Sequence, residues 1–386
     1  MDYRTAGESH GRALIALVSG VPAGVPLTAA DIDLDLARRQ KGYGRGGRMA
    51  IETDRGVILA GVRHGSTTGA PVAVTIANRD SENWTDVMSP AAVPADADAA
   101  AGAVSAPRPG HADLAGCQRI GSTDARDVLE RASARETAAR VAAGAVAKAL
   151  LKQLGVEVFS WVEGIGAVSC GIQVPGSLDR SLIEACDVRC PDKTAAAAMR
   201  AAIDAAREGG ESLGGVVAVA ATGLVPGLGS YTERRDGLDA RLAGALASIP
   251  AIKGVEFGDG FALAARPGSE AHDAIVRGAD GGAMRATNRA GGLEGGMSNG
   301  ETLLVRLAMK PIPTLMKPLA TIDMVSGEAA DAARERSDVC AVPAAGVVAE
   351  AETALVLADA YTRMFGDTCL SDIIAAVERY RERTRL

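Results

Sequence analysis

The feature that most constrains the fold is a long alanine-rich stretch, RASARETAARVAAGAVAKALLKQLGVEVFSWV, which covers residues 131–162. Ser133 and Glu136 have the spacing of a capping box, and the sequence after them favours one continuous helix as far as Gly155. A strand is expected to follow, ending at Val162. A helix of this length followed at once by a strand indicates a large, ordered domain.

The other elements follow from the same kinds of signal. Thr28 can cap a helix that Gly42 ends, and a helix over 343–365 is apolar enough to lie in the core. The remaining expectations are a strand pair in 56–78, a helix ending at Gly209, a strand in 214–225 and a helix followed by a strand in 238–258. Because helices and strands mix without strict βαβ alternation, we predict an α+β or layered architecture rather than a doubly wound sheet. Residues 87–109 could form either a disordered linker or an ordered surface loop.

Charge and apolar patterning limit what the protein can do. The formal net charge is −7, whereas a general nucleic-acid binder normally has a basic surface. No apolar run reaches the roughly 18 to 20 residues that span a bilayer, and no secretion signal is evident. The six cysteines lack paired CxxC spacing, so most are expected to be reduced core residues and no metal site is expected. We therefore expect a cytoplasmic protein without nucleic-acid or membrane partners.

The segment GYGRGG, residues 42–47, matches the G-x-G-x-x-G pattern of dinucleotide-binding sites. That pattern requires a preceding strand, whereas this segment follows a predicted helix, so a nicotinamide-dependent oxidoreductase is not favoured. Arg39, Arg45 and Arg48 surround the glycines and could converge on a phosphate or a carboxylate. On these residues alone, a solvated basic loop remains the alternative.

A second candidate segment is PRPGHADLAG, in which two prolines stiffen a loop that carries Arg108 and His111. A histidine held beside an arginine suits proton transfer near an anion, although this histidine could equally be structural. Arg131 and Arg135 flank the amino terminus of the long helix, where backbone amides favour negative charge. These groups point to an anionic ligand.

The turn KPIPT offers one more anion site. Lys310 and Thr314 could hold a phosphate there, and no P-loop for a nucleoside triphosphate occurs in the sequence. His64 and His272 have no comparable surroundings and are interpreted as surface or structural residues.

Eight segments occur together in the order found in one enzyme family: TAGESHGRAL, RRQKGYGRGGRM, RPGHAD, LERASARETAARVAAG, SIPAIKGVEFGDGF, NRAGGLEGGMSNG, KPIPT and RSDVCAVPAAGVV. Over nearly its whole length the chain resembles chorismate synthase. The resemblance implies conversion of 5-enolpyruvylshikimate 3-phosphate into chorismate and phosphate, the last common step of the shikimate pathway. This anti-1,4-elimination needs reduced FMN without net redox change. The implied fold is a layered β-α-β sandwich, with a helical core flanked by antiparallel sheets, assembled as a homotetramer.

The resemblance also implies roles for four catalytic residues. His10, in GESHG, is expected to protonate the departing phosphate, with Ser9 beside it. His111 is expected to hold a proton for the reduced flavin ring and to stabilise its anionic form. Asp338, in RSD, is expected to lie near flavin N5 and to relay the proton abstracted from carbon 6, with Ser9 as a possible intermediary.

Binding residues are implied by the same motifs. The substrate carries a phosphate and two carboxylates, and its expected contacts are Arg39, Arg45, Arg48, Arg108 and Arg135. The expected FMN contacts are Arg131, Ala132, Ser133, Pro250, Ala251, Gly295, Lys310, Pro311, Ile312, Pro313, Thr314 and Arg336, of which Lys310 and Thr314 would face the FMN phosphate. Many relatives have histidine where this chain has Ser337 and a polar amide where it has Pro250. These departures concern flavin contacts and leave every proposed catalytic group in place.

The whole chain, 1–386, is expected to form a single catalytic domain. It contains no recognisable reductase domain, so an external flavin reductase is the expected source of reduced FMN, and NADPH would enter only indirectly. One alternative function is a non-catalytic flavin- or anion-binding module, which would tolerate the loss of His10 or Asp338.

Overall fold

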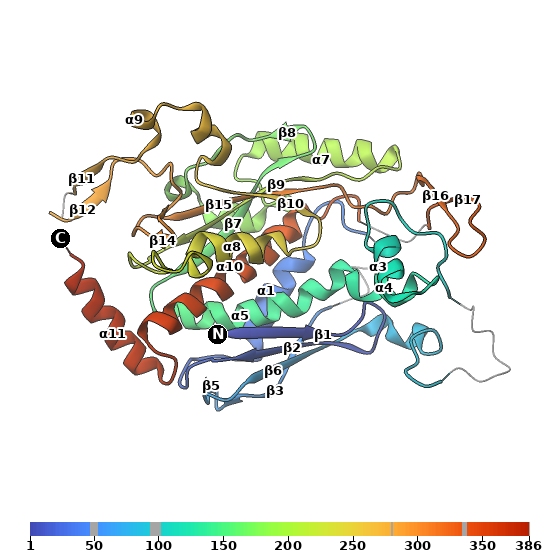
Figure 1. Ribbon diagram of the computed structural model, residues 1–386, viewed down its shortest axis with the longest axis horizontal. Helices are drawn as coiled ribbons and strands as arrows, with labels where there is room; N and C mark the ends of the chain where they lie inside the picture. Colours follow the sequence, from blue (N-terminus) through green and yellow to red (C-terminus); the bar gives the residue numbers. More distant parts are fainter. Residues whose placement is uncertain (47–52, 93–101, 279–280, 334–337, 386) are drawn as a thin grey trace.

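The computed structural model describes residues 1–46, 53–92, 102–278, 281–333 and 338–385 (Figure 1). Its first sheet has four antiparallel strands in the order β1-β2-β6-β3. These strands are β1 (Asp2–Ala6), β2 (Ala13–Ser19), β3 (Gly56–Ala60) and β6 (Val72–Ala77), and a small hairpin of β4 (Val62–Arg63) and β5 (Ser66–Thr67) lies between β3 and β6 in sequence. The strand pair predicted in 56–78 is confirmed, since β3 pairs with β6.

The second sheet has five antiparallel strands in the order β10-β15-β9-β7-β8. They are β7 (Glu157–Ile165), β8 (Val168–Ser169), β9 (Gly215–Thr222), β10 (Ile252–Phe257) and β15 (Leu303–Met309). The strands predicted in 156–162, 214–225 and 238–258 are confirmed as β7, β9 and β10. Most side chains of β15 are buried, as expected for a strand covered on both faces.

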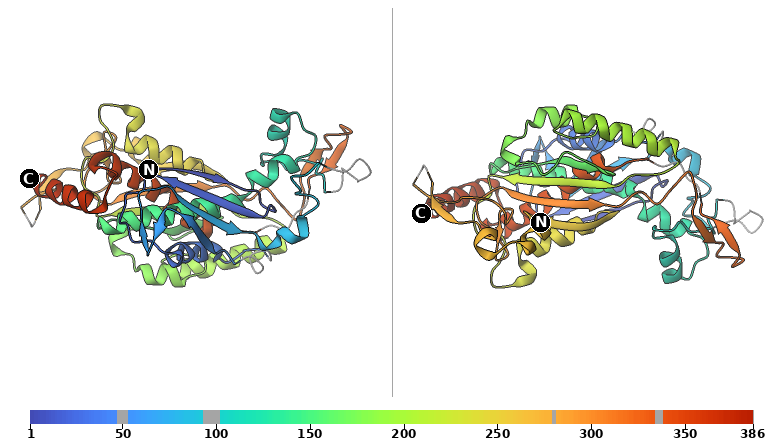
Figure 2. Two further views of the ribbon diagram at one scale, coloured as in Figure 1. Left: turned by 90° about the horizontal axis from the view of Figure 1, so that it is seen from below. Right: turned by 90° about the horizontal axis from the view of Figure 1, so that it is seen from above.

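Two long helices lie between the sheets: α5 (Thr137–Gln153) and α10 (Val342–Phe365). The helix α5 packs on β2 and β6 of the first sheet, α10 packs on β7 and β9 of the second, and the helices pack against each other. Figure 1 shows the first sheet below this pair and the second sheet above it, and Figure 2 shows the first sheet in front when seen from below and the second when seen from above. One continuous cluster of buried apolar residues joins both sheets to both helices. The core position predicted for the helix in 343–365 is therefore confirmed.

Small residues allow the two core helices to approach closely. A Cβ atom added to Gly144 of α5 would lie 2.3 Å from the Cβ of Ala351 in α10, which is closer than real carbon atoms come. Glycine therefore stands in the interior of a helix, where it costs about 0.5–1 kcal/mol relative to alanine, because the backbones touch at this point. The alanine-rich composition of 131–162 reflects this close packing.

Further helices cover the outer surfaces. The helix α1 (Ala29–Gln40) packs on α5 and α10, and its capping box at Thr28 confirms the predicted start. The helix α7 (Lys193–Glu208) packs on β7 and β8, and α8 (Leu238–Ala247) packs on α10 and β10. The other helices are α3 (Asp113–Ile120), α4 (Arg126–Ala132), α6 (Arg180–Ala185), α9 (Gly268–Ala271) and α11 (Leu370–Arg383).

Short elements complete the chain. Three hairpins pair β11 (Ile275–Arg277) with β12 (Ala283–Arg285), β13 (Leu293–Glu294) with β14 (Met297–Ser298), and β16 (Ala320–Ile322) with β17 (Ala329–Asp331). The 3₁₀ turns are η1 (Arg79–Trp84), η2 (Ala134–Glu136), η3 (Pro175–Ser177), η4 (Arg234–Asp236) and η5 (Gly260–Ala265). Mixed helices and antiparallel sheets confirm the α+β class. Across the described part of the chain, no helix is long and apolar enough to cross a membrane.

The capping box predicted at Ser133 and Glu136 is wrong. The Ser133 hydroxyl accepts a hydrogen bond from the Arg135 amide and so caps the η2 turn, and α5 starts only at Thr137. The Glu136 carboxylate does not fold back on the backbone, because Thr5 Oγ1 at 2.6 Å and Arg140 Nε at 2.8 Å bind it instead. These tertiary contacts bind the carboxylate that a capping box would require.

The described residues near the end of 87–109 pack against a neighbouring hairpin. Within 87–109, residues 93–101 lie outside the described residues, whereas the Ser105 carbonyl accepts a hydrogen bond from the Met324 amide at 2.8 Å. This portion therefore packs on the β16–β17 hairpin.

All six cysteines are free thiols. Cys117, Cys190 and Cys340 are buried and the other three are half-buried, so the core position predicted for most of the cysteines holds for three of them.

Candidate active site

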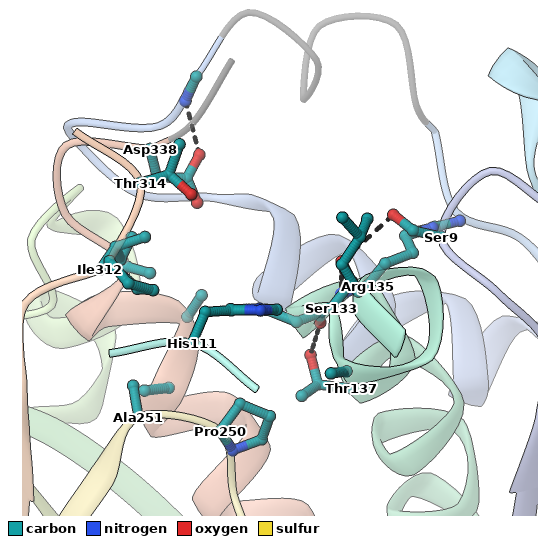
Figure 3. Close-up of a pocket in the computed structure, with 18 of the residues that line it drawn as sticks. Ser9, His111, Ser133, Arg135, Thr137, Pro250, Ala251, Ile312, Thr314 and Asp338 are labelled. Carbon is teal, nitrogen blue, oxygen red and sulfur yellow. Dashed lines mark hydrogen bonds between the residues drawn. The ribbon is translucent and has the colours of Figure 1, made fainter. Parts of the chain in front are cut away.

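A cavity of about 890 Å³ lies where the amino-terminal ends of the two core helices meet loops from both sheets. Its lining includes Thr137, the first residue of α5, and Ala344, Ala345 and Val348 from the first turns of α10. Helix amino termini carry unsatisfied amides and partial positive charge, which favours anions. The volume falls in the range of roughly 300–1,000 Å³ typical of ligand pockets. Figure 3 shows the side chains that face it.

His10 lies on one wall of this cavity and is held by Glu130 of α4. Its Nδ1 atom is 2.8 Å from Glu130 Oε1, and its backbone amide donates to Glu130 Oε2 at 2.9 Å. The imidazole ring stacks on Trp84, with 4.0 Å between ring centroids. Burial alone would raise the pKa of Glu130, but hydrogen bonds from His10 and Arg126 hold this pKa below its usual range.

His111 also lines the cavity and has a similar partner. Its Nδ1 atom is hydrogen-bonded to Asp113, which is fully buried. Arg108 Nε donates to the second oxygen of Asp113 at 2.8 Å, and Arg108 Nη1 donates to Thr314 Oγ1 at 3.1 Å. Burial would raise the pKa of Asp113, but the bonds from His111 and Arg108 hold it well below its usual range.

A group of arginines forms the floor near α1. Arg39 donates to Thr137 Oγ1 and to the Ala134 carbonyl, both at 2.9 Å, while Arg135 donates to Asp54 at 2.8 Å. Burial is the main cause that lowers the pKa of Arg39 to about 9, so its guanidinium remains a cation at neutral pH. Three arginines, Arg39, Arg45 and Arg135, line the cavity together, which makes this side attractive to anions.

Asp338 is held beside this arginine group. Its carboxylate accepts the Gly46 amide at 2.7 Å and pairs with Arg45 Nη1 at 3.0 Å. Ser9 also lines the cavity, where its hydroxyl accepts a hydrogen bond from Ser133 Oγ at 3.2 Å. The cavity therefore contains a carboxylate and a hydroxyl group besides the two histidines.

The remaining wall is built from two turns that touch. The Lys310 amide donates to the Ala251 carbonyl at 2.9 Å, and Lys310 Nζ donates to the Gly110 carbonyl at 2.8 Å. Ala251 has φ of 70°, a left-handed conformation that costs a non-glycine residue roughly 1–2 kcal/mol. Burial, with Lys253 nearby, lowers the pKa of Lys310. Pro250, Ile312 and Pro313 add apolar surface.

Residues 1–362 match the family model described as chorismate synthase. The chain belongs to the chorismate synthase family. It is 55% identical over 388 residues to the chorismate synthase of Symbiobacterium thermophilum, with 99% of each chain covered. It is 57% identical over 380 residues to that of Moorella thermoacetica, with 98% of each chain covered. A solved structure, "Crystal Structure of Chorismate Synthase", aligns with a TM-score of 0.77 at 37% identity over 100% of this chain and 98% of that one.

Most residues that the chorismate synthase motifs singled out lie in this one cavity. It is lined by Ser9, His10, Arg39, Arg45, Arg108, His111, Ala132, Ser133, Arg135, Pro250, Ala251, Lys310, Ile312, Pro313, Thr314 and Asp338. Arg48 and Arg336 lie outside the described residues. Segments more than three hundred residues apart in sequence thus converge on one volume.

Three residues expected to contact the cofactor do not line the cavity. Arg131 is turned away, because its guanidinium donates to the carbonyls of Thr5 at 3.0 Å and Gly7 at 3.2 Å, and its side chain is 43% exposed. Gly295 lies in the turn between β13 and β14, and Pro311 is exposed between two lining residues. The cofactor contacts predicted for these three residues stay predictions, and in this structure Arg131 is bonded to the first strand.

Sequence reasoning missed several residues of the site. Asp80 and Trp84 of η1 line the cavity, and Glu130 binds His10 from α4. Trp84 is one of only two tryptophans in the chain, and Arg126 stands four residues before Glu130, the spacing of a helical ion pair. Those two signals could have drawn attention to the residues, but neither indicates the contact with His10.

Proposed function

We propose that this lyase of the chorismate synthase family converts 5-enolpyruvylshikimate 3-phosphate into chorismate and inorganic phosphate. The observation that carries the proposal is the placement of His10 and His111, each bonded to a carboxylate, in one cavity whose lining also holds Arg39, Arg45 and Arg135. In the reaction the carbon–oxygen bond to phosphate breaks, a proton leaves carbon 6, and the freed electrons form the new double bond. The reaction therefore needs an acid near the departing phosphate and a proton acceptor near carbon 6.

The arginines supply the binding site for the substrate. Arg39, Arg45 and Arg135 are proposed to bind the phosphate and carboxylates, because guanidinium groups bind such anions with paired hydrogen bonds. Arg108 is proposed as a further substrate contact, and because it donates to Asp113, the partner of His111, we propose that it also orients that histidine. Arg48 is proposed as a further contact from its motif alone.

The residues present fit reduced FMN as the cofactor. FMN needs an apolar surface for its ring and a cationic group for its phosphate. Lys310 supplies the cationic group, and the prolines of its turn form an apolar wall together with Ile312 and Ala251. We propose that Lys310 and Thr314 bind the phosphate of FMN, and that Ala132, Ser133, Pro250, Ala251, Ile312 and Pro313 lie along it. When bound there, reduced FMN would supply the electron density that the elimination needs.

The proton-transfer groups are assigned by their surroundings. His10 is proposed to donate a proton to the departing phosphate. His111, bonded through Nδ1 to Asp113, is proposed to hold a proton for the reduced flavin ring. Asp338 is proposed to take up the proton from carbon 6, with Ser9 as an intermediary, since both line the cavity.

An anaerobic assay tests the proposed function. The purified protein is mixed with the enolpyruvyl substrate and chemically reduced FMN, while chorismate absorbance and phosphate release are followed together. Equal amounts of both products, absent with oxidised FMN, are the expected result. A folded protein that binds FMN but forms neither product would favour the binding-module alternative. Titration with NADPH and FMN separately tests the nicotinamide alternative, for which GYGRGG lacks a preceding strand.

Substrate affinity is expected to fall as salt rises. The arginine group recognises a multiply charged anion, and the screening length shrinks from about 10 Å at 0.1 M salt to about 3 Å at 1 M. The dissociation constant of the substrate, measured by equilibrium binding, should increase across this range while the thermal unfolding temperature reports that the fold persists. A constant that is independent of salt would contradict the role of the arginines.

The proposed function includes an architecture, an oligomeric state and a source of reduced flavin. The packing of α5 and α10 between two antiparallel sheets supports a layered β-α-β sandwich formed by a single catalytic domain, 1–386. We further propose a cytoplasmic homotetramer that depends on an external flavin reductase, with NADPH used only by that reductase. Size-exclusion chromatography with light scattering tests the oligomeric state.

A further inference from the structure

The surroundings of His10 form a closed ring of four side chains. Glu130 Oε1 is 2.8 Å from His10 Nδ1 and 2.9 Å from Arg126 Nη1. Trp84 completes the ring, because its indole stacks on His10 at 4.0 Å and carries the Arg126 guanidinium at 5.2 Å from a ring centroid. Two charged partners and one aromatic surface thus restrain a single imidazole.

The ring determines which nitrogen of His10 carries a hydrogen toward Glu130. An ionised carboxylate only accepts hydrogen bonds, so Nδ1 must be the donor in this contact. The His10 amide also donates to Glu130 Oε2 at 2.9 Å, and the Ser9 amide donates to the Glu130 carbonyl at 2.9 Å. The backbone of the GESHG segment is therefore tied to α4, and the proton that His10 gains or loses is the one on Nε2.

Glu130 is buried, with 3% of its surface exposed, so its charge acts through little solvent. A carboxylate in contact with an imidazole favours the protonated ring, and stacking on an indole favours a cation further. Arg126 opposes this effect, because it shares Glu130 Oε1 with His10. Other charged groups that face this region include Asp80, whose Oδ2 accepts from Trp84 Nε1 at 3.2 Å, and Glu8 in the same loop.

We propose that Glu130 is a positioning residue that fixes the orientation and the Nδ1–H tautomer of His10 and stabilises its protonated form. This inference rests on the proposed function only in giving His10 an acid's task. The same arrangement occurs at His111, where the carboxylate of Asp113 binds both the histidine and Arg108, as Glu130 binds both His10 and Arg126.

Trp84 provides a readout that is independent of turnover. A protonated imidazole in contact with an indole quenches its fluorescence more strongly than a neutral one. The chain has two tryptophans, so subtracting the emission of the Trp84→Phe variant from that of the unsubstituted protein isolates Trp84 from Trp161. The pH at which the isolated emission changes reports the titration midpoint of His10.

Glu130→Gln is expected to move this midpoint about 1 pH unit or more toward lower pH. For this variant, the emission of the Glu130→Gln, Trp84→Phe double variant is the one subtracted. Arg126→Gln is expected to move it in the opposite direction, because it removes the competing cation. A matched control is Glu163→Gln, which uncharges another buried carboxylate, bound by Arg306 at 2.8 Å in the second sheet, and should leave the midpoint unchanged. A merely structural role for Glu130 would not move the midpoint in two directions.

Coincident midpoints in the unsubstituted protein and in Glu130→Gln would overturn the inference, and Arg126→Gln keeps the test available if Glu130→Gln fails to fold. Turnover separates this result from the proposed function. At a pH above the midpoints of both proteins, lowering the midpoint by about 1 pH unit reduces the protonated fraction of His10 about tenfold. Turnover of Glu130→Gln should therefore fall by a similar factor. A lower midpoint with unchanged turnover at every pH would support the role of Glu130 and remove His10 as the acid.

Discussion

The His10→Ala and His111→Ala enzymes are expected to turn over at least ~10²-fold more slowly than the unsubstituted protein, the usual scale for losing a positioned acid or base. Each histidine lines the cavity and is bonded to a buried carboxylate, so truncation removes a proton-transfer group that the fold holds in one position. Turnover should be measured anaerobically with saturating reduced FMN, so that weaker flavin binding does not enter the result.

His272→Ala is the control for this pair, because His272 is exposed and does not line the cavity. It should keep full turnover. If His10→Ala or His111→Ala also kept full turnover, the assignment of that residue would be wrong. A loss in His111→Ala that follows FMN affinity alone, and disappears at saturation, would assign His111 to cofactor binding instead.

The second large effect concerns stability and arises from Glu350, a fully buried carboxylate in α10. Arg38 donates to it at 2.7 and 2.8 Å, Lys148 at 2.7 Å, Arg189 at 3.1 Å and Ser160 at 2.7 Å. Glu350→Ala would leave these cations without their central partner. Breaking a buried ion pair from one side costs about 3–5 kcal/mol, so we expect a clearly lower unfolding temperature and urea midpoint.

Glu184→Ala is the matched control, since Glu184 also binds Arg38 and Arg189 but its side chain is 38% exposed. Partly exposed ion pairs contribute at most about 1 kcal/mol, so the control should lose much less stability. Equal losses in the two variants would show that burial of Glu350 is not the source of the effect.

The same carboxylate predicts how stability depends on pH. Burial would raise the pKa of Glu350, but Lys148, Arg38 and Arg189 hold it well below the ordinary value. The unfolded chain therefore binds a proton to this group more readily than the folded protein. The stabilisation is fully present above about pH 4.3, the ordinary value for glutamate, and is lost as the pH falls further. Acid unfolding should be less steep in Glu350→Gln.

Much of the fold could be predicted from local pattern, because the core helices and central strands carry strong periodicity and clear end signals. The start of α5 could not, because Thr5 and Arg140 bind Glu136 and leave Ser133 to cap the η2 turn. Those contacts depend on where the first strand lies. Local rules fail at this point because tertiary partners compete for the same carboxylate.

In the candidate site, too, local motifs predicted some residues, whereas contacts that depend on the tertiary fold could not be predicted. Motifs located His10, His111 and Asp338, since each stands in a distinctive run of glycine, proline or arginine. Glu130 and Trp84 were missed because their contact with His10 exists only after η1 and α4 pack beside the GESHG loop. The bond from Arg131 to the first strand was missed for a related reason, because a flanking arginine can turn toward either side of a helix end.

The spread of the cavity lining from Ser9 to Val348 has a consequence for biosynthesis. Because α10 follows every strand of both sheets in the sequence, the ribosome exposes apolar faces of the sheets before this helix exists to cover them. Contacts between such distant parts of a chain form slowly, and exposed apolar faces favour aggregation. Nascent chains of this protein should therefore depend on chaperones until nearly the whole sequence has emerged, and a fragment that ends before Val348 lacks part of the cavity lining.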